Sequence, residues 1–259
     1  VDYPGAYSPN FLDPIERSLS RKSFEFSGGL PFFGVDYWGA LEFSWLNKKG
    51  IPVYSFCHIY VPCESPFLVE SKSLKYYLNS FYQTVFSDQD HVKETLVQDL
   101  SGCLGDEVKI DLVPIADMTP PISFSGHCLD GLDLHDLSFD SIDPTLLRAG
   151  SALIEEHVFS DLFRSVCPVT GQPDWASIQI IYKGKAIDHE GLLRYLLSFR
   201  NHPGFHEHCV ERIFMDILKQ VSPSLLSVYA CFNRRGGIFI NPFRSTRPQK
   251  DPLSWHIRQ

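Results

Sequence analysis

The sequence lacks any run of about 18 apolar residues, the length that a helix needs to cross a bilayer, so no membrane partner is expected. Its first residues, VDYPGAYSPNFLDP, carry neither a basic stretch nor an apolar core, so no signal peptide is predicted there. The seven cysteines are scattered, odd in number and form no CxxC pair. This pattern excludes a disulfide framework and is typical of a reduced, cytoplasmic protein.

Positive charge is scarce, because 23 Lys and Arg residues stand against 31 Asp and Glu, for a net charge of −8. A protein that coats nucleic acid needs a basic face, so no nucleic-acid partner is predicted. An anionic ligand must instead meet a local basic cluster. Neither a GxGxxG nor a P-loop pattern follows a strand and opens a helix, which excludes Rossmann and P-loop sites. The hydrophobic fraction of 44% is normal for a globular protein with a core.

An internal repeat organises the chain, since YLNSF at 77–81 matches YLLSF at 195–199 in a gapless alignment at an offset of 118 residues. Apolar residues at helical spacing predict two helices in each copy. The first helix of each copy is predicted at 72–84 and 189–201, and the second at 89–103 and 206–220. Strand patterns flank both helix pairs, and Gly236-Gly237 signals a hairpin.

Each half is therefore predicted to be a β-β-α-α-β-β unit, an antiparallel sheet with two helices on one face, which gives an α+β fold class. The fourth strand of the first half would be ISFSGHCL at 122–129. An acidic stretch at 129–147 is predicted to link an N-terminal module at 27–128 to a C-terminal module at 148–259. Duplicated halves commonly place sites where their elements meet.

The stretch SVCPVTGQPDW, residues 165–175, puts Cys167 and Asp174 in a loop stiffened by two prolines. A free cysteine is most often a small buried hydrophobe, but this one lies among turn residues without apolar periodicity, which favours a nucleophile. Asp174 stands beside Trp175, where desolvation would suit a general acid. The alternative is a strand residue that accepts a turn hydrogen bond.

The stretch NHPGFHEHCVER, residues 201–212, opens a predicted helix with His206 and Glu207. An acidic residue at a helix N-terminus can be only a dipole partner. A metal site is the other possibility, because His206 and Cys209 share a helix face and Cys167 could be a third ligand, but no fourth ligand is apparent. Cys209 is also either a packed core residue or a partner for an oxidised Cys167.

Two further stretches carry charge suited to ligands. VESKSLK, residues 69–75, opens a helix where Glu70 can be a dipole partner or a carboxylate that accepts two N–H bonds from a guanine-like ring. Lys72 can meet a phosphate as a point charge. In NRRGGIFINPFRS, residues 233–245, the arginines are either solvated hairpin charges or a cationic pocket for a phosphorylated cofactor. Three arginines could reach a 2′-phosphate: Arg234, Arg235 and Arg244.

Together, and in this order, ESKSLKYYLNSF, CPVTGQPDW, FHEHCVERI and RRGGIFINPFRS resemble the NADPH-dependent 7-cyano-7-deazaguanine reductases in their long, two-module form. The resemblance runs from about residue 27 to 245. It implies a tunnelling fold related to GTP cyclohydrolase I, NADPH as the cofactor, a homodimer with strands continuing across subunits, and no catalytic metal.

The resemblance also assigns residues. It implies that Cys167 is the nucleophile, Asp174 the proton donor, and His206 and Glu207 a substrate-binding pair of which His206 is also catalytic. It places further substrate contacts on Val69, Glu70 and Ser71. The cofactor contacts that it implies are Ser71, Lys72, Arg235 and Gly236.

The implied reaction reduces the nitrile of 7-cyano-7-deazaguanine to the amine of 7-aminomethyl-7-deazaguanine, with two NADPH and a covalent cysteine thioimide, in the biosynthesis of the tRNA nucleoside queuosine. Two alternatives belong to other classes. A cysteine-dependent nitrile hydrolase would release ammonia and would not use NADPH. A non-catalytic purine- or pterin-binding tunnelling-fold protein would consume neither the nitrile nor NADPH.

Overall fold

The computed structural model describes residues 5–24, 28–137, 139–248 and 253–259. The chain divides into two compact units, each assembled from separate stretches of sequence. Unit 1 comprises Val1–Ser23, Val35–Pro120 and Arg234–Ile240, and unit 2 comprises Phe24–Gly34, Pro121–Asn233 and Asn241–Gln259. Among the described helices, none combines the length and the apolar character needed to pass through a bilayer.

The sheet of unit 1 is built on a long antiparallel hairpin of β2 (Phe33–Leu46) and β3 (Pro52–Pro62). Strand β5 (Lys109–Val113) pairs antiparallel with β3. The hairpin turns at Asn47, whose side chain accepts the main-chain N–H groups of Lys49 and Ile51. The strand patterns predicted before the first helix pair are thus confirmed, and they form an antiparallel hairpin.

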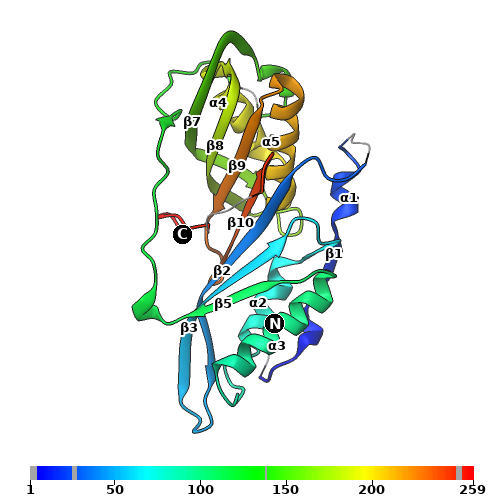
Figure 1. Ribbon diagram of the computed structural model, residues 1–259, viewed down its shortest axis with the longest axis vertical. Coiled ribbons are helices and arrows are strands. Elements are labelled where there is room, and N and C mark those ends of the chain that lie inside the picture. The colour runs from blue at the N-terminus through cyan, green and yellow to red at the C-terminus, as the bar shows by residue number, and fades with distance from the viewer. Residues whose placement is uncertain (1–4, 25–27, 138, 249–252) are drawn as a thin grey trace. The chain divides into compact units, whose positions relative to one another are not determined.

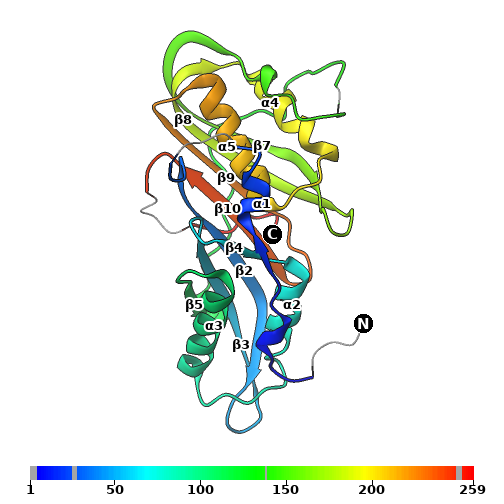
Figure 2. The same cartoon turned by 90° about the vertical axis from the view of Figure 1, so that its right-hand side faces the viewer.

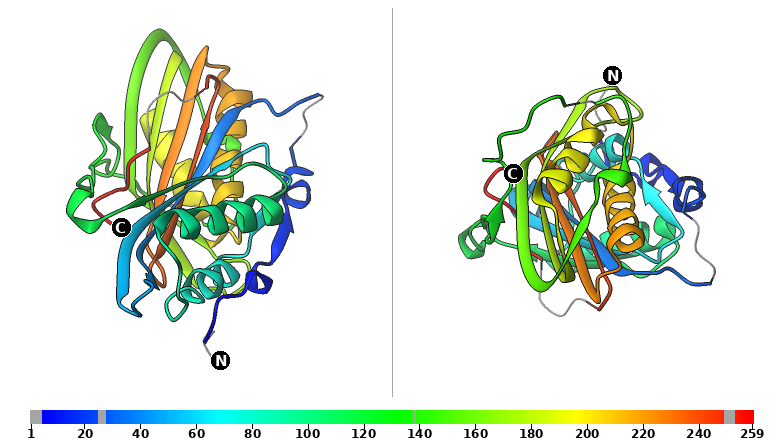
Figure 3. Two further views of the ribbon diagram at one scale, coloured as in Figure 1. Left: turned by 60° about the horizontal axis from the view of Figure 1, so that its bottom comes forward. Right: turned by 90° about the horizontal axis from the view of Figure 1, so that it is seen from above.

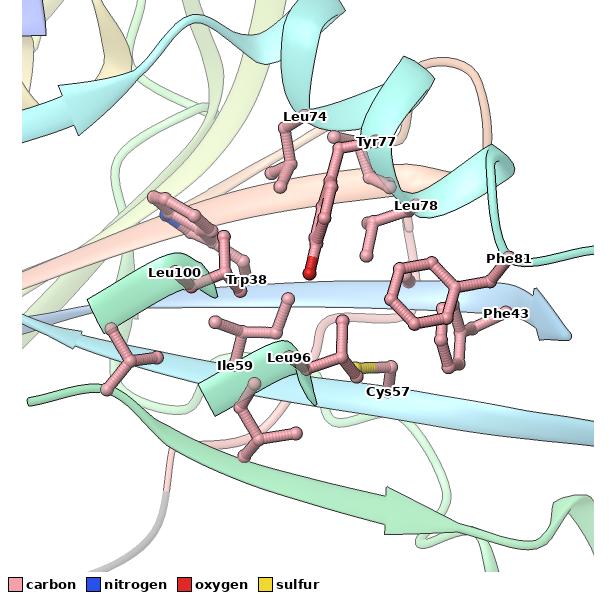
Figure 4. Packing of buried hydrophobic residues seen from close by; sticks show 14 of the residues in the cluster. Trp38, Phe43, Cys57, Ile59, Leu74, Tyr77, Leu78, Phe81, Leu96 and Leu100 are labelled. Atoms are coloured by element: carbon pink, nitrogen blue, oxygen red, sulfur yellow. The ribbon is translucent and has the colours of Figure 1, made fainter. Parts of the chain in front are cut away.

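Helices α2 (Ser71–Asn79) and α3 (Gln89–Leu104) cover one face of this sheet (Figure 1). Tyr77 and Leu78 of α2, together with Leu96 of α3, point toward Trp38 and Ile59 on the strands (Figure 4). All five side chains are buried. The apolar spacing that predicted these helices therefore marks the faces that build the core of unit 1.

An N-terminal segment, which the repeat did not predict, crosses unit 1. After the short turn η1 (Pro9–Phe11), strand β1 (Pro14–Glu16) pairs antiparallel with β4 (Phe67–Val69), and α1 (Arg17–Arg21) follows. The buried Arg17 guanidinium lies 2.6 Å from Asp36 Oδ2 and also donates to the Phe67 carbonyl. This segment fixes the strand that leads into α2.

The sheet of unit 2 contains β7 (Ala149–Val166), β8 (Pro173–Ile187) and β9 (Leu225–Phe232), and the later part of β10 (Ile238–Ser245) extends it. Neighbouring strands in this set are antiparallel. Helices α4 (His189–Leu197) and α5 (His206–Val221) lie together on one face of the sheet, as Figures 2 and 3 show. The chain is thus a mixed α+β protein with mainly antiparallel strands.

The internal repeat extends to individual hydrogen bonds. In unit 1 the Tyr77 hydroxyl donates to Asp99 Oδ2 at 2.7 Å, and in unit 2 the Tyr195 hydroxyl donates to Asp216 Oδ2 at 2.7 Å. Each pair joins the first helix of its unit to the second. Tyr77 and Tyr195 lie 118 residues apart and Asp99 and Asp216 lie 117 apart, so the two helix pairs keep the same bond at nearly the same offset, which indicates one duplicated structural plan.

The first helix of each unit ends earlier than the sequence predicted. Helix α2 ends at Asn79, and α4 ends at Leu197, where the 3₁₀ turn η4 (Ser198–Asn201) takes over. A serine follows each end, and its hydroxyl donates to the carbonyl three residues back at 2.6 Å, Ser80 to Tyr77 and Ser198 to Tyr195. A serine that takes a helical carbonyl in this way competes with the main-chain ladder.

The fourth strand predicted for the first half is wrong. Only His127–Cys128 of that stretch forms a strand, β6, and it belongs to unit 2, where it pairs parallel with β7. Gly126 permits this approach, because a Cβ there would lie 2.3 Å from the His157 carbonyl oxygen. The acidic stretch after it contains only the short turn η3 (Pro144–Leu146) among its described residues.

Candidate active site

The loop between β7 and β8 holds Cys167 in a closed turn at the end of a hairpin. Its N–H donates to the Gln172 carbonyl at 2.9 Å, and its own carbonyl accepts the Gly171 N–H at 3.0 Å. Gly171 has φ +71°, a left-handed conformation that favours glycine. Cys167 itself is partly exposed at this end of the hairpin.

Asp174 lies across the same hairpin, opposite Ser165, two residues before the cysteine. Only 2% of the residue is exposed. The next residue, Trp175, is fixed from the neighbouring strand end, because it donates its N–H to Asn233 Oδ1 at 2.9 Å. The carboxyl is therefore held by strand pairing close to the loop of Cys167, as the two-proline stretch suggested.

The segment before α5 is joined to the strand that carries the cysteine. Val166 donates its N–H to the His202 carbonyl at 2.9 Å, and Gly204 returns an N–H to the Val166 carbonyl at 3.0 Å. These bonds bring the first turn of α5, with His206 and Glu207, to the same end of unit 2. Glu207 is buried, with 5% of its surface exposed.

A carboxyl–imidazole pair forms at this place. His206 Nε2 lies 3.3 Å from Asp174 Oδ2. The imidazole stacks on Phe232 with the ring centroids 3.8 Å apart and the planes 5° from parallel. Its buried Nδ1 has no hydrogen-bond partner within the described ranges. The pair can move a proton between a buried carboxyl and a ring that Phe232 holds in one plane.

Cys209 behaves differently from Cys167. Its side chain is fully buried in α5. Burial raises the pKa of its thiol to about 12, with the nearby carboxylates of Asp174 and Glu207 acting in the same direction. Among the described residues, no group of three or more His, Cys, Asp and Glu side chains has an arrangement suited to a metal ion. Of the two cysteines, Cys209 is buried with a raised thiol pKa, and Cys167 is partly exposed.

The remaining predicted residues lie in unit 1, at the start of α2 and in the turn before β10. Val69 is buried at the end of β4, Glu70 precedes the helix, and Ser71 is its first residue. Lys72 is exposed, with its Nζ 5.8 Å from the centroid of the Tyr76 ring. A cation and a hydroxyl thus share the first turn of one helix.

Arg235 and Gly236 form a tight hairpin turn, in which Arg235 and Ile238 exchange main-chain hydrogen bonds of 2.9 and 3.4 Å. Gly236 and Gly237 have φ values of +61° and +84°, both left-handed. A Cβ on Gly236 would lie 3.0 Å from Cδ of Lys75, so the turn packs directly on the side of α2. The two stretches predicted to bind the cofactor therefore meet within unit 1, next to a cavity of about 50 Å³.

One candidate for the 2′-phosphate is excluded. Arg244 is completely buried, and its guanidinium donates to Glu211 Oε1 at 3.1 and 2.7 Å and to the Phe243 carbonyl. Arg234 pairs with Glu42 at 3.0 Å at the surface. Arg244 thus supports the fold of unit 2, and the turn residue Arg235 is the better candidate for a phosphate contact.

This assignment predicts opposite effects for two arginines. Arg244→Leu should remove the Arg244 guanidinium from the buried Glu211 carboxylate, which costs about 3–5 kcal/mol of folding free energy. Arg235→Leu should leave the melting temperature nearly unchanged and raise the KM for NADPH. Thermal melts and NADPH titrations of both variants check this. A raised KM for Arg244→Leu with an unchanged melting temperature would contradict it.

Two residues near the predicted contacts, Phe232 and Lys75, were not predicted from the sequence. Phe232, which holds the His206 ring, is one apolar residue in a strand. Lys75 lies one turn beyond Lys72 on the same helix, so its helical spacing could have identified it as a neighbour of the predicted cofactor contacts. Its contact with Gly236 links positions that are far apart in sequence, and no local pattern reveals such a contact.

Comparison with known proteins finds the same names repeatedly. The family model described as "Nitrile reductase, 7-cyano-7-deazaguanine-reductase N-term" matches residues 3–112, and the one described as "QueF-like protein" matches residues 173–251. A protein of Burkholderia lata named NADPH-dependent 7-cyano-7-deazaguanine reductase is 50% identical over 256 residues, which are 96% of this chain and 92% of that protein.

A protein of the same name from Legionella pneumophila is 48% identical over 251 residues, which are 95% of this chain and 88% of that protein. Among solved structures, the apo form of the archaeosine synthase QueF-Like is 17% identical, with a TM-score of 0.33. That likeness covers 39% of this chain and 99% of the solved chain.

Proposed function

The chain belongs to the family of NADPH-dependent 7-cyano-7-deazaguanine reductases, and from this membership we propose how its residues carry out the reaction. The enzyme is an oxidoreductase that uses NADPH to reduce the nitrile of 7-cyano-7-deazaguanine to the primary amine of 7-aminomethyl-7-deazaguanine, in queuosine biosynthesis. The observation that carries the residue assignment is the end of unit 2, where a reachable thiol lies on the same hairpin as a buried carboxyl–imidazole pair.

Cys167 is the nucleophile of this proposal. Its thiolate adds to the nitrile carbon, so a carbon–sulfur bond forms while one carbon–nitrogen π bond breaks. The nitrogen takes a proton from Asp174, and the product is a covalent thioimide. A nitrile accepts hydride poorly and a protonated thioimide accepts it well, so the covalent step divides one difficult reduction into easier ones. Rigid placement of the thiol and the acid serves as preorganisation.

His206 supports the proton donor. Its Nε2 faces Asp174, so the imidazole can return a proton to the carboxylate after each transfer. When the carbon has been reduced once, the carbon–sulfur bond breaks, Cys167 leaves as thiolate, and an imine remains to be reduced to the amine. Across both rounds the substrate takes up four hydrogens, two as hydride and two as protons.

The residues of unit 1 suit NADPH, which when bound supplies one hydride in each of the two rounds. Lys72 and Arg235 supply positive charge for phosphate groups in an otherwise acidic chain. Gly236 has no side chain, so a ligand can approach the main chain of the turn. Ser71 offers a hydroxyl at the first position of α2.

Carboxylates recognise the substrate ring in this proposal. Glu207 and Glu70 accept N–H groups of the deazaguanine, and Val69, Ser71 and His206 complete the contacts. Only 5% of the Glu207 surface is exposed. An N–H group of the substrate that binds to Glu207 is therefore shielded from water, and Glu207 is its hydrogen-bond acceptor in place of water.

Replacing Glu207 tests this role. Glu207→Leu should weaken substrate binding by about 1–3 kcal/mol or more, because a buried donor is then left unmatched. NADPH binding should change little. Calorimetric titration with each ligand measures both, with Glu190→Leu, an exposed carboxylate on α4, as the control. An equal loss for the two ligands would mean that Glu207 supports the fold.

The proposal also covers the fold. We assign the chain a tunnelling fold of two tandem modules at 27–128 and 148–259 with a linker at 129–147, supported by the duplicated Tyr77–Asp99 and Tyr195–Asp216 bonds. Three stretches of these modules group with the opposite unit: 27–34, 121–128 and 234–240. We also propose a cytoplasmic location on the cysteine usage, no nucleic-acid partner on the net charge of −8, and a homodimer on the family membership.

One assay separates the proposed reaction from its alternatives. NADPH absorbance is followed with and without 7-cyano-7-deazaguanine, and the reductase consumes two NADPH for each nitrile. A nitrile hydrolase would release ammonia while the absorbance stays constant. A non-catalytic binding protein would change neither the absorbance nor the ammonia concentration. The result expected for the hydrolase or for the binding protein would refute the proposed reductase activity.

A further inference from the structure

The carboxylate of Glu70 is held on one side only. Its Oε2 accepts the main-chain N–H of Ser73 at 2.8 Å and the hydroxyl of the same residue at 3.3 Å. Its Oε1 has a single weak contact among the described residues, the Ser71 hydroxyl at 3.5 Å. One oxygen is thus committed to the helix, and the other keeps most of its acceptor capacity for a ligand.

The cap of α4 in unit 2 can be compared directly with the cap of α2 in unit 1, because the two units are duplicates. Glu70 precedes α2 as Asp188 precedes α4, at the same offset of 118 residues. In unit 1 the Glu70 N–H donates to the Asp13 carbonyl at 3.0 Å, and in unit 2 the Asp188 N–H donates to the Arg148 carbonyl at 2.9 Å. The main-chain frames therefore correspond, and differences between the two caps lie in the side chains.

Those side chains differ in a specific way. Asp188 caps α4 by accepting the Gly191 N–H at 3.1 Å, and no hydroxyl is present because residue 191 is glycine. Asp is a preferred capping residue, and Glu is not among the preferred ones. The Glu70 side chain is therefore longer than capping requires. The unit that has this longer acid, unit 1, is also the one that has a hydroxyl three residues later, at Ser73.

We propose that Ser73 is a positioning residue for substrate binding, because its hydroxyl fixes the Glu70 carboxylate so that Oε1 faces the ligand. This inference rests on the proposed function, in which Glu70 contacts the deazaguanine ring. A glutamate carboxylate rotates freely about its last torsion, and a second donor on Oε2 restricts that rotation before the substrate arrives. Ser73 touches neither the substrate nor the reacting carbon.

Ser73→Ala is the test. We expect the KM for 7-cyano-7-deazaguanine to rise about fivefold, the effect of one ordinary hydrogen bond. The kcat and the KM for NADPH should stay within about twofold of wild type, since Ser73 acts only through Glu70. The melting temperature should be unchanged or higher, because alanine is the best helix former. Ser73→Thr keeps the hydroxyl and should restore the wild-type KM.

Asp188→Ala is the matched control in unit 2. It removes the cap of α4, so it should lower the melting temperature and leave the KM for the nitrile unchanged. An unchanged KM for Ser73→Ala, or an equal rise of KM in Asp188→Ala, would overturn the positioning role. The turnover of the wild type tests the proposed function separately. If the wild type does not reduce the nitrile, the proposed function is wrong. If the wild type reduces the nitrile and Ser73→Ala has the same KM, only the positioning role of Ser73 is wrong.

Discussion

Replacing Cys167 with alanine should lower nitrile reduction on the order of 10³-fold or more while the protein stays folded and binds its substrate. In the proposed mechanism the thiol forms the bond that turns the nitrile into a thioimide, and the Cys209 and Cys231 thiols of unit 2 are buried. Its loop is closed by main-chain bonds to Gln172 and Gly171, so the smaller side chain leaves the turn intact. Activity should fall without a matching fall in melting temperature.

The covalent adduct gives the direct measurement. Intact-protein mass spectrometry with the nitrile and without NADPH should show one added substrate on the wild type and none on Cys167→Ala. Cys128→Ala is the matched control, because Cys128 is also free and is more exposed than Cys167. An adduct that persists in Cys167→Ala, or that disappears in Cys128→Ala, would assign the nucleophile elsewhere.

The sequence predicted the helices because their apolar faces are local patterns. Spacing along α3 and α5 shows which side of each helix is buried, and the repeat at YLNSF and YLLSF doubles that signal. Their starts at Gln89 and His206 match the predicted ones. The earlier ends of α2 and α4 could not be read from apolar spacing, because the apolar pattern continues past them, and each end carries a serine whose hydroxyl bonds a helical carbonyl.

Contacts between distant segments were beyond the sequence. The pairing of β1 with β4 and the buried Arg17–Asp36 ion pair join segments far apart in the sequence, and the parallel pairing of β6 needs the close approach at Gly126. Likewise, the motif containing Arg244 does not show that this arginine is buried against Glu211. Such choices follow from three-dimensional packing, whereas residue types at fixed spacing specify only which groups are able to react.

The end of unit 2 is where local and distant information combine. The stretch CPVTGQPDW placed Asp174 seven residues after Cys167, but it did not show what faces the carboxyl. The structure puts His206 there, 3.3 Å away, with its ring plane fixed by Phe232. In the proposed mechanism the imidazole returns a proton to the carboxylate after each transfer, which suits a reaction with two reductions.

Asp174→Asn should therefore keep the fold and reduce kcat by about 10²–10⁴-fold, the usual contribution of a general acid. The amide fills the same space and can still bond to His206, but it has no carboxylic proton to give to the nitrogen. Adduct formation measured by mass spectrometry should slow in parallel, because thioimide formation needs that proton. Thermal melting should show a change much smaller than the change in rate.

Asp216→Asn is the control for replacing a buried, hydrogen-bonded aspartate. Asp216 accepts the Tyr195 hydroxyl at 2.7 Å and the Arg212 Nε at 2.7 Å, so its replacement should lower the melting temperature and leave kcat close to wild type. The two variants thus separate chemistry from stability within one unit. If Asp174→Asn instead turns over at a near-normal rate at every pH tested, Asp174 is a structural residue of the hairpin, and the proton must come from another group.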